Sequence, residues 1–149
     1  DDEGKTYRQA AVPVSLQLTS LYFLNEHLGW ATGHGGLILS TVDGGEHWAV
    51  QHVNLAADQP LFSVYFRNPQ DGWAVGLWSL MLVTHDGGRS WTEVALPPPP
   101  GARKADLNLF KMFGSDNGTL YITAERGYVL RSRDGSSWDY LATGMISCI

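Results

Sequence analysis

The chain has 149 residues, 44% of them hydrophobic and only 17% charged, which predicts a single domain over residues 1–149 with one substantial core. A net charge of −5 argues against nucleic acid or an anionic membrane surface as a partner. No run of about 20 apolar residues is present that could span a membrane. The single cysteine, Cys148, cannot form an internal disulfide, and no Cys/His cluster has metal-ligand spacing, so we expect neither metal nor cofactor.

The N-terminal segment begins Asp1-Asp2-Glu3-Gly4 without an initiator methionine, which indicates a processed or trimmed piece of a longer chain. Within it, Tyr7–Val14 resembles the outer strand that follows Trp48 further along the sequence. We therefore expect residues 1–14 to form the outer strand of a preceding or closing sheet.

The first complete unit contains four short segments that are typical of β-strands, at residues 21–24, 29–33, 37–41 and 48–53. The first segment is apolar on both sides, like an innermost strand, and the last alternates apolar and polar residues, like a half-exposed outer strand. A glycine-rich hairpin turn is predicted at His34-Gly35-Gly36, and Asp43-Gly44-Gly45 is a second tight-turn signal. No stretch keeps a 3.6-residue apolar period over a dozen residues, so the unit is all-β.

The same unit recurs without a gap 43 positions later. The segment GWATG at 29–33 corresponds to GWAVG at 72–76, and residues 41–48 correspond to residues 84–91. A weaker third copy ends at residue 138. A period in the forties is about one four-stranded blade of a β-propeller. The predicted fold is therefore about three four-stranded antiparallel blades, at roughly residues 15–55, 58–98 and 106–144.

Each unit has the same corner after its third strand, built from a hydroxyl residue, an aspartate, a glycine and a tryptophan. The aspartate is expected to accept backbone N–H groups of the turn, while the hydroxyl closes the turn and the glycine adopts a positive φ. The tryptophan covers the turn and packs between blades. These structural positions are Thr41, Asp43, Gly45 and Trp48 in the first blade, Thr84, Asp86, Gly88 and Trp91 in the second, and Ser132, Asp134 and Trp138 in the third, whose turn is one residue shorter.

The pattern Ser/Thr-x-Asp-x-Gly-x-x-Trp is identified as the Asp-box, or bacterial neuraminidase repeat, of β-propellers. Together with GWATG at 29–33 and DGWAVG at 71–76, it resembles the photosystem II stability and assembly factor family (Ycf48-like) over roughly residues 15–140. The resemblance implies a protein of bacterial type that binds a protein partner, which we expect to belong to a membrane complex. It also implies a periplasmic or otherwise extracytoplasmic location.

Three blades leave two open sheet faces rich in aromatic residues, whereas a closed propeller usually has at least four blades. We expect the partial propeller to be completed by missing blades or by self-association, unless the three blades adopt an unusual compact packing. A homodimer that forms a six-bladed ring hides the most apolar area. Met145–Ile149 is predicted to begin a further inner strand.

The enzymatic alternative is a fragment of a sialidase-like glycoside hydrolase, or a glycan-binding propeller. Arg67 lies in Phe66-Arg67-Asn68-Pro69, which is superficially similar to the Phe/Tyr-Arg-Ile-Pro motif of sialidases, but it stands where every blade has a loop. The acids Glu93, Asp106 and Glu125 have no motif that pairs them for glycoside hydrolysis. The Asp-box aspartates already use their oxygens in the turn. We therefore predict no catalytic residue and a non-enzymatic binding or assembly scaffold.

By analogy with other propellers, the binding face is expected to carry the connections between blades and the turns that join second and third strands. The partner-binding candidates are then His34, Trp78 and Arg126 in the turns, and Arg103 and Lys104 after the stiff segment Pro97–Pro100. Trp78 stands where the first repeat has Gly35, and an exposed tryptophan is typical of a binding hot spot. The alternative is that Trp78 caps the next blade.

Overall fold

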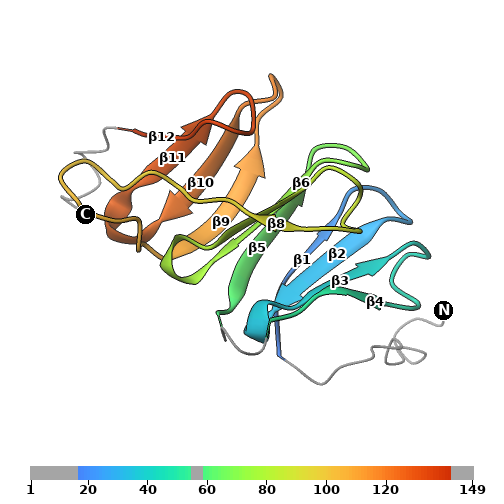
Figure 1. The fold of residues 1–149 in the computed structure, drawn as a ribbon. Helices are drawn as coiled ribbons and strands as arrows, with labels where there is room; N and C mark the ends of the chain where they lie inside the picture. The colour runs from blue at the N-terminus through green and yellow to red at the C-terminus, as the bar shows by residue number, and fades with distance from the viewer. Residues whose placement is uncertain (1–16, 55–58, 142–149) are drawn as a thin grey trace.

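The computed structural model describes residues 17–54 and 59–141, and this part of the chain forms twelve strands in three separate four-stranded antiparallel sheets (Figure 1). Blade 1 comprises β1 (Leu18–Phe23), β2 (Gly29–Gly33), β3 (Ile38–Thr41) and β4 (Ala49–His52). Blade 2 comprises β5 (Leu61–Phe66), β6 (Gly72–Gly76), β7 (Met81–Thr84) and β8 (Thr92–Glu93). Blade 3 comprises β9 (Leu109–Gly114), β10 (Leu120–Ala124), β11 (Val129–Ser132) and β12 (Asp139–Tyr140). The predicted fold class is confirmed.

The three sheets stack in chain order, with blade 2 between blades 1 and 3 (Figure 1). Every sheet uses consecutive strands side by side, and the first strand of blade 2, β5, contacts the first strands of both other blades, β1 and β9. The largest buried clusters lie between the sheets: one joins blades 1 and 2 around Trp30 and Phe66, and the other joins blades 2 and 3 around Trp73 and Met112. The interfaces between blades therefore supply most of the core.

Large and small residues face one another across the first two strands of each blade. Phe23 pairs with Gly29 in blade 1, and Phe66 pairs with Gly72 in blade 2. A Cβ atom on Gly29 would lie 2.7 Å from the Phe23 ring, so the ring occupies the space that a side chain would need. In blade 3 the sizes are reversed, because Gly114 pairs with Leu120.

The glycine-rich turn predicted at His34-Gly35-Gly36 joins the antiparallel strands β2 and β3, as a hairpin turn does. Residues His34–Gly36, Leu77–Ser79 and Glu125–Gly127 form short 3-10 turns. The predicted strands at residues 1–14 and at Met145–Ile149 lie outside the described residues, as does Cys148. The described residues include no helix with the length and apolar character needed to cross a membrane.

Candidate protein-binding face

One end of the stack carries the three Asp-box corners, which we call the Asp-box face. In blade 1 the Thr41 hydroxyl donates to Asp43 Oδ1 at 2.8 Å and accepts the backbone N–H of Gly45 at 3.0 Å. Asp43 Oδ1 also accepts the backbone N–H of His47 at 3.0 Å. The same atoms are used in blade 2, and blade 3 has a tighter version in which Asp134 accepts two successive backbone N–H groups. Each corner is thus closed by its own residues.

These hydrogen bonds stabilise the charged form of the aspartates. Backbone and side-chain donation from His47, followed by the Thr41 hydroxyl, holds the pKa of Asp43 far below its usual range. Donation from the Ser90 hydroxyl and backbone does the same to the pKa of Asp86. In blade 3, backbone N–H groups lower the pKa of Asp134 to about 2. All three carboxylates are fully ionised acceptors at neutral pH and are unsuited to donating a proton as a general acid.

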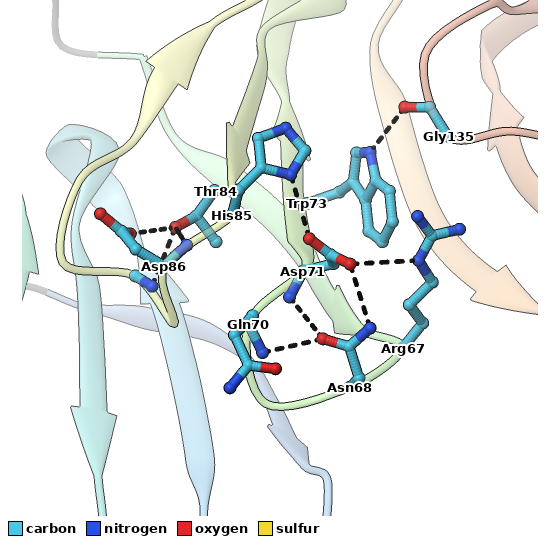
Figure 2. A network of polar contacts seen from close by, with 10 residues as sticks. Arg67, Asn68, Gln70, Asp71, Trp73, Thr84, His85, Asp86 and Gly135 are labelled. Atoms are coloured by element: carbon cyan, nitrogen blue, oxygen red, sulfur yellow. Dashed lines mark hydrogen bonds and ion pairs between the residues drawn. The ribbon is translucent and has the colours of Figure 1, made fainter.

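Arg67, the candidate that resembled a sialidase arginine, is part of the packing between blades 2 and 3 (Figure 2). Its guanidinium lies over the Trp73 ring, 5.1 Å from the ring centroid, and its Nε is 3.7 Å from Asp71 Oδ2. Trp73 Nε1 donates to the carbonyl of Gly135 in the third Asp-box at 3.1 Å. The geometry assigns Arg67 a structural role, because its planar face contacts Trp73 and its charge contacts Asp71, although the residue itself is exposed.

The corresponding interface between blades 1 and 2 is built differently, and this difference is not visible in the sequence repeat. Trp30 stacks face to face on Phe66 with ring centroids 3.5 Å apart. Gln51 Nε2 donates to the carbonyl of Gly87 at 3.2 Å, and Trp30 Nε1 is buried without a hydrogen-bond partner. Gln51, from the outer strand of blade 1, therefore donates to the Asp-box turn carbonyl of blade 2. In the interface between blades 2 and 3, the Trp73 indole donates to the corresponding carbonyl, that of Gly135.

The opposite end of the stack, which we call the connection face, carries the three 3-10 turns and the two connections between blades. Gly35, Trp78 and Arg126 occupy the same position in their turns, and all have a left-handed backbone, with φ of 71°, 53° and 65°. Glycine adopts this conformation at little cost, whereas a tryptophan or arginine there is uncommon. Trp78 is 61% exposed.

The turn that carries Trp78 is anchored to the connection that leads into blade 3. Ser79 donates its backbone N–H to the Leu107 carbonyl at 2.6 Å, and the Ser79 hydroxyl accepts the backbone N–H of Leu107 at 3.1 Å. Ser79 itself is buried and also has a positive φ, of 58°. The surrounding structure thus holds two successive residues in the left-handed region and directs Trp78 toward solvent.

Asn108 links the Trp78 turn to the Arg126 turn. Its side-chain oxygen accepts the backbone N–H of Trp78 at 3.2 Å, and its own backbone N–H donates to Glu125 Oε1 at 3.0 Å. The backbone N–H of Glu125 in turn donates to the Asn108 carbonyl at 2.9 Å. Sequence reasoning missed Asn108, because the equivalent position before β5 is Pro60, which offers its carbonyl to Leu77 but has no backbone N–H or polar side chain to make the other two contacts.

The remaining candidates lie on exposed parts of the connections and turns. His34 is exposed, and its backbone N–H donates to the Gln17 carbonyl at 2.9 Å. Arg103 and Lys104 are exposed in the long connection between β8 and β9, which lies along blade 3 where the Tyr140 hydroxyl donates to the Pro97 carbonyl at 2.7 Å. No carboxylate in the described ranges forms an ion pair with Arg103, Lys104 or Arg126. Within the same ranges, no group of His, Cys, Asp and Glu could hold a metal ion.

Comparison with known proteins identifies the family. The model of a protein family described as photosynthesis system II assembly factor YCF48 matches residues 2–144. The chain belongs to this family. No curated protein matches it.

Solved structures of this family share the fold. YCF48 bound to a D1 peptide has a TM-score of 0.72 and 27% sequence identity, over 87% of this chain and 42% of that chain. YCF48 from Cyanidioschyzon merolae has a TM-score of 0.72 and 22% identity, over 91% of this chain and 43% of that chain. An ancestral GH74 enzyme has a TM-score of 0.65 and 14% identity, over 85% of this chain and 18% of that chain, a likeness of fold alone. The chain spans less than half the length of the YCF48 structures, which agrees with a partial propeller.

Proposed function

We propose that this chain is a non-enzymatic binding and assembly module that holds an exposed segment of a partner protein on its connection face. Membership of the YCF48 assembly factor family supports this role, as does the similarity to a YCF48 structure that contains a D1 peptide. We extend the proposal to a partner that belongs to a membrane complex and to an extracytoplasmic location, as membership of this family implies.

The proposal depends on the observation that Trp78 is exposed while its backbone is held in the left-handed region. A large aromatic side chain that is 61% exposed contributes little to the core, yet its backbone is held in a conformation that disfavours bulky residues. Leu107 and Asn108 of the connection between blades fix that conformation, through hydrogen bonds to Ser79 and to the Trp78 backbone. Rigid, exposed tryptophans are typical hot spots of protein interfaces, because they bury a large area with little loss of conformational entropy.

Positive charge accompanies this tryptophan although the chain as a whole is acidic. Arg126 is exposed in the turn that Asn108 connects to Trp78, and Arg103 and Lys104 follow the proline segment of the same connection. A partner segment with an acidic side chain or a terminal carboxylate complements this face. His34 extends the face toward blade 1.

The glycosidase alternative lacks support from the site. The Asp-box carboxylates are used in their own turns, and Arg67 is used at an interface between blades. We therefore make no second proposal for a glycan partner.

The test is a titration of a fluorescent D1 peptide into the chain, followed by anisotropy. Trp78→Gly and Arg126→Gly remove the two side chains while keeping a residue suited to the left-handed backbone, as Gly35 does in blade 1. We expect each variant to weaken binding by about tenfold or more, as for interface hot spots. Arg89→Ala, at an exposed arginine of the Asp-box face, serves as the matched control and should bind like the unmodified chain. Equal affinity of all four proteins, or loss of binding only in the control, would contradict the proposal.

A further inference from the structure

The loops that join the first and second strands of the three blades have a common design. Each is closed by a backbone N–H that donates to the carbonyl four residues later: Leu24 to Leu28, Arg67 to Asp71 and Ser115 to Thr119. In blades 1 and 2 an asparagine, Asn25 or Asn68, folds its side chain over the following peptide, and its oxygen accepts two backbone N–H groups (Figure 2 shows Asn68). Blade 3 has its asparagine, Asn117, one place later in the loop.

The residue that follows each asparagine decides whether the side-chain amide can react with the backbone, because the nucleophile is the nitrogen of that next residue. Asn68 is followed by Pro69, whose nitrogen carries no hydrogen. Asn25 is followed by a glutamate, whose side chain crowds the nitrogen. Asn117 is followed by Gly118, where even an added Cβ atom would meet nothing within 4 Å. Of these three loops, the one in blade 3 therefore leaves the nitrogen open to attack the amide.

The hydrogen bonds of the Asn117 side chain activate its amide. Its Oδ1 accepts the backbone N–H of Thr119 at 3.1 Å and the hydroxyl of Ser115. The bond to Thr119 folds the side chain back over the Gly118 peptide, which brings Cγ toward the Gly118 nitrogen. Both donors stabilise the negative charge that forms on Oδ1 when this nitrogen adds to Cγ, as donors do in an oxyanion hole. Asn117 and Gly118 are exposed, so water reaches the reacting atoms.

The blade 3 loop is also held less firmly than its two counterparts. In blades 1 and 2 the Asp-box turn donates a backbone N–H to a loop carbonyl at 3.0 Å: Gly44 to His27, and Gly87 to Gln70. In the shortened third Asp-box, the N–H of Gly135 donates to the hydroxyl of Ser132 at 2.8 Å instead. The blade 3 loop lacks this tie to its Asp-box, so its backbone can adjust while a ring closes.

We propose that Asn117 is a site of spontaneous modification, at which the folded chain converts this asparagine to isoaspartate or aspartate. The Gly118 N–H leaves the Ser115 carbonyl, to which it donates at 3.0 Å, and loses its proton to water. The nitrogen forms a bond to Asn117 Cγ, the Cγ–Nδ2 bond breaks, and Nδ2 takes up a proton and departs as ammonia. Water then opens the five-membered succinimide ring at one of its two carbonyls, which gives isoaspartate or aspartate.

Isoaspartate changes this loop in two ways. It adds a negative charge next to Asp116, and it routes the main chain through the former side-chain methylene, so the Thr119 N–H loses its Oδ1 acceptor. Because this loop connects β9 to β10, the modification loosens the first hairpin of blade 3. The Trp78 turn lies at the opposite end of the stack, so peptide binding by the modified chain tests the proposed function separately.

The test is a time course of the folded 149-residue chain in neutral buffer, with isoaspartate located by enzymatic methylation and peptide mass spectrometry. We expect it to accumulate at position 117 while Asn25, Asn68 and Asn108 stay unchanged. Asn117→Gln keeps an amide but needs a larger ring for closure, so it should abolish the signal at this position. An intact Asn117 in the folded chain, after the urea-unfolded chain has converted, would overturn the proposal.

Ser115→Ala separates the contribution of the folded loop from that of the Asn-Gly sequence. It removes one donor to Oδ1, so conversion in the folded chain should slow severalfold. In concentrated urea the loop is absent, and the variant and the unmodified chain should convert at the same rate, which is the matched control. A urea titration shows that the variant is folded before the time course. Equal rates in the two folded proteins would contradict activation by the loop.

Pro69→Gly tests the role of the Asp-box tie. It gives blade 2 an Asn-Gly pair in a loop that keeps the bond from Gly87 to Gln70. We expect Asn68 in this variant to convert severalfold more slowly than Asn117 of the same molecule. Faster conversion at Asn68 would show that the tie does not protect the loop.

Discussion

At the scale of single residues, two tryptophans with the same place in the repeat have different environments. Trp30 and Trp73 are both almost completely buried, at 3% and 1% exposure, and both belong to an interface between blades. Only the Trp73 indole N–H has a partner, the Gly135 carbonyl. The repeat predicts that both are buried, but not which one is hydrogen bonded, because Gln51 from a less regular outer strand decides that.

This pair allows a matched measurement of one buried hydrogen bond. Trp73→Phe leaves the Gly135 carbonyl without its donor, whereas Trp30→Phe removes an N–H group that is already unpaired. We expect Trp73→Phe to lower the free energy of unfolding by about 1 kcal/mol more than Trp30→Phe does. Urea denaturation of the two variants measures the difference. Equal losses would show that the indole hydrogen bond adds nothing to stability.

At the scale of the strands, the sequence repeat predicts blades 1 and 2. Blade 3 departs from the repeat because two paired positions on neighbouring strands have exchanged a large and a small residue. The first two blades were predictable because the GWxxG strand and the Asp-box recur at a constant shift. In blade 3, Leu120 replaces the first glycine of that motif and Gly114 replaces the phenylalanine opposite it. The exchange keeps one large and one small residue facing each other, but it removes the glycine and the phenylalanine by which the repeat is recognised. The third repeat therefore looks weak in the sequence.

Such a size match predicts strong coupling between the two positions. Gly72→Leu in blade 2 places a side chain where the Phe66 ring lies, so we expect a loss of about 3 kcal/mol in the free energy of unfolding through overpacking. Phe66→Ala in the same protein makes room for the leucine. The double variant should be less destabilised than the sum of the two single variants, and urea denaturation of all four proteins gives the coupling energy. Additive losses would mean that the two sites are independent.

The candidate binding face shows the limit of sequence reasoning at this scale. The position of Trp78 opposite the Asp-box corners followed from the strand order. The left-handed backbone at Trp78 and Arg126 did not, because neither residue type favours it. Contacts from the connection between blades, through Ser79 and Asn108, impose that conformation, and such contacts depend on the tertiary fold.

At the scale of the whole molecule, stability is distributed along the stack. The main contacts between described strands of different blades join neighbouring blades, as in other repeat proteins. Within the described residues, the cluster between blades 2 and 3 has twelve buried members and the cluster between blades 1 and 2 has eight, so blade 1 is held by the smaller interface. Blade 1 should therefore open more readily than the other two.

Amide hydrogen exchange tests this order. The strands β2 and β6 are both central and equally buried, which makes them a matched pair. We expect the amides of β2 to exchange about tenfold faster than those of β6, because sub-global opening follows local packing. Equal protection in the two strands would indicate that the described blades unfold as one cooperative unit.

The self-contained Asp-box corner has an evolutionary consequence. Since Thr41, Asp43 and the following backbone satisfy one another within a few positions, a gene segment that encodes one blade carries everything needed to fold that corner. Duplication or loss of such a segment changes the number of sheets without breaking the hydrogen bonds that close each corner, and the contacts between blades have to be matched anew, including the bonds from Gln51 and Trp73 to turn carbonyls. Propellers of different length can thus arise from the same module by recombination.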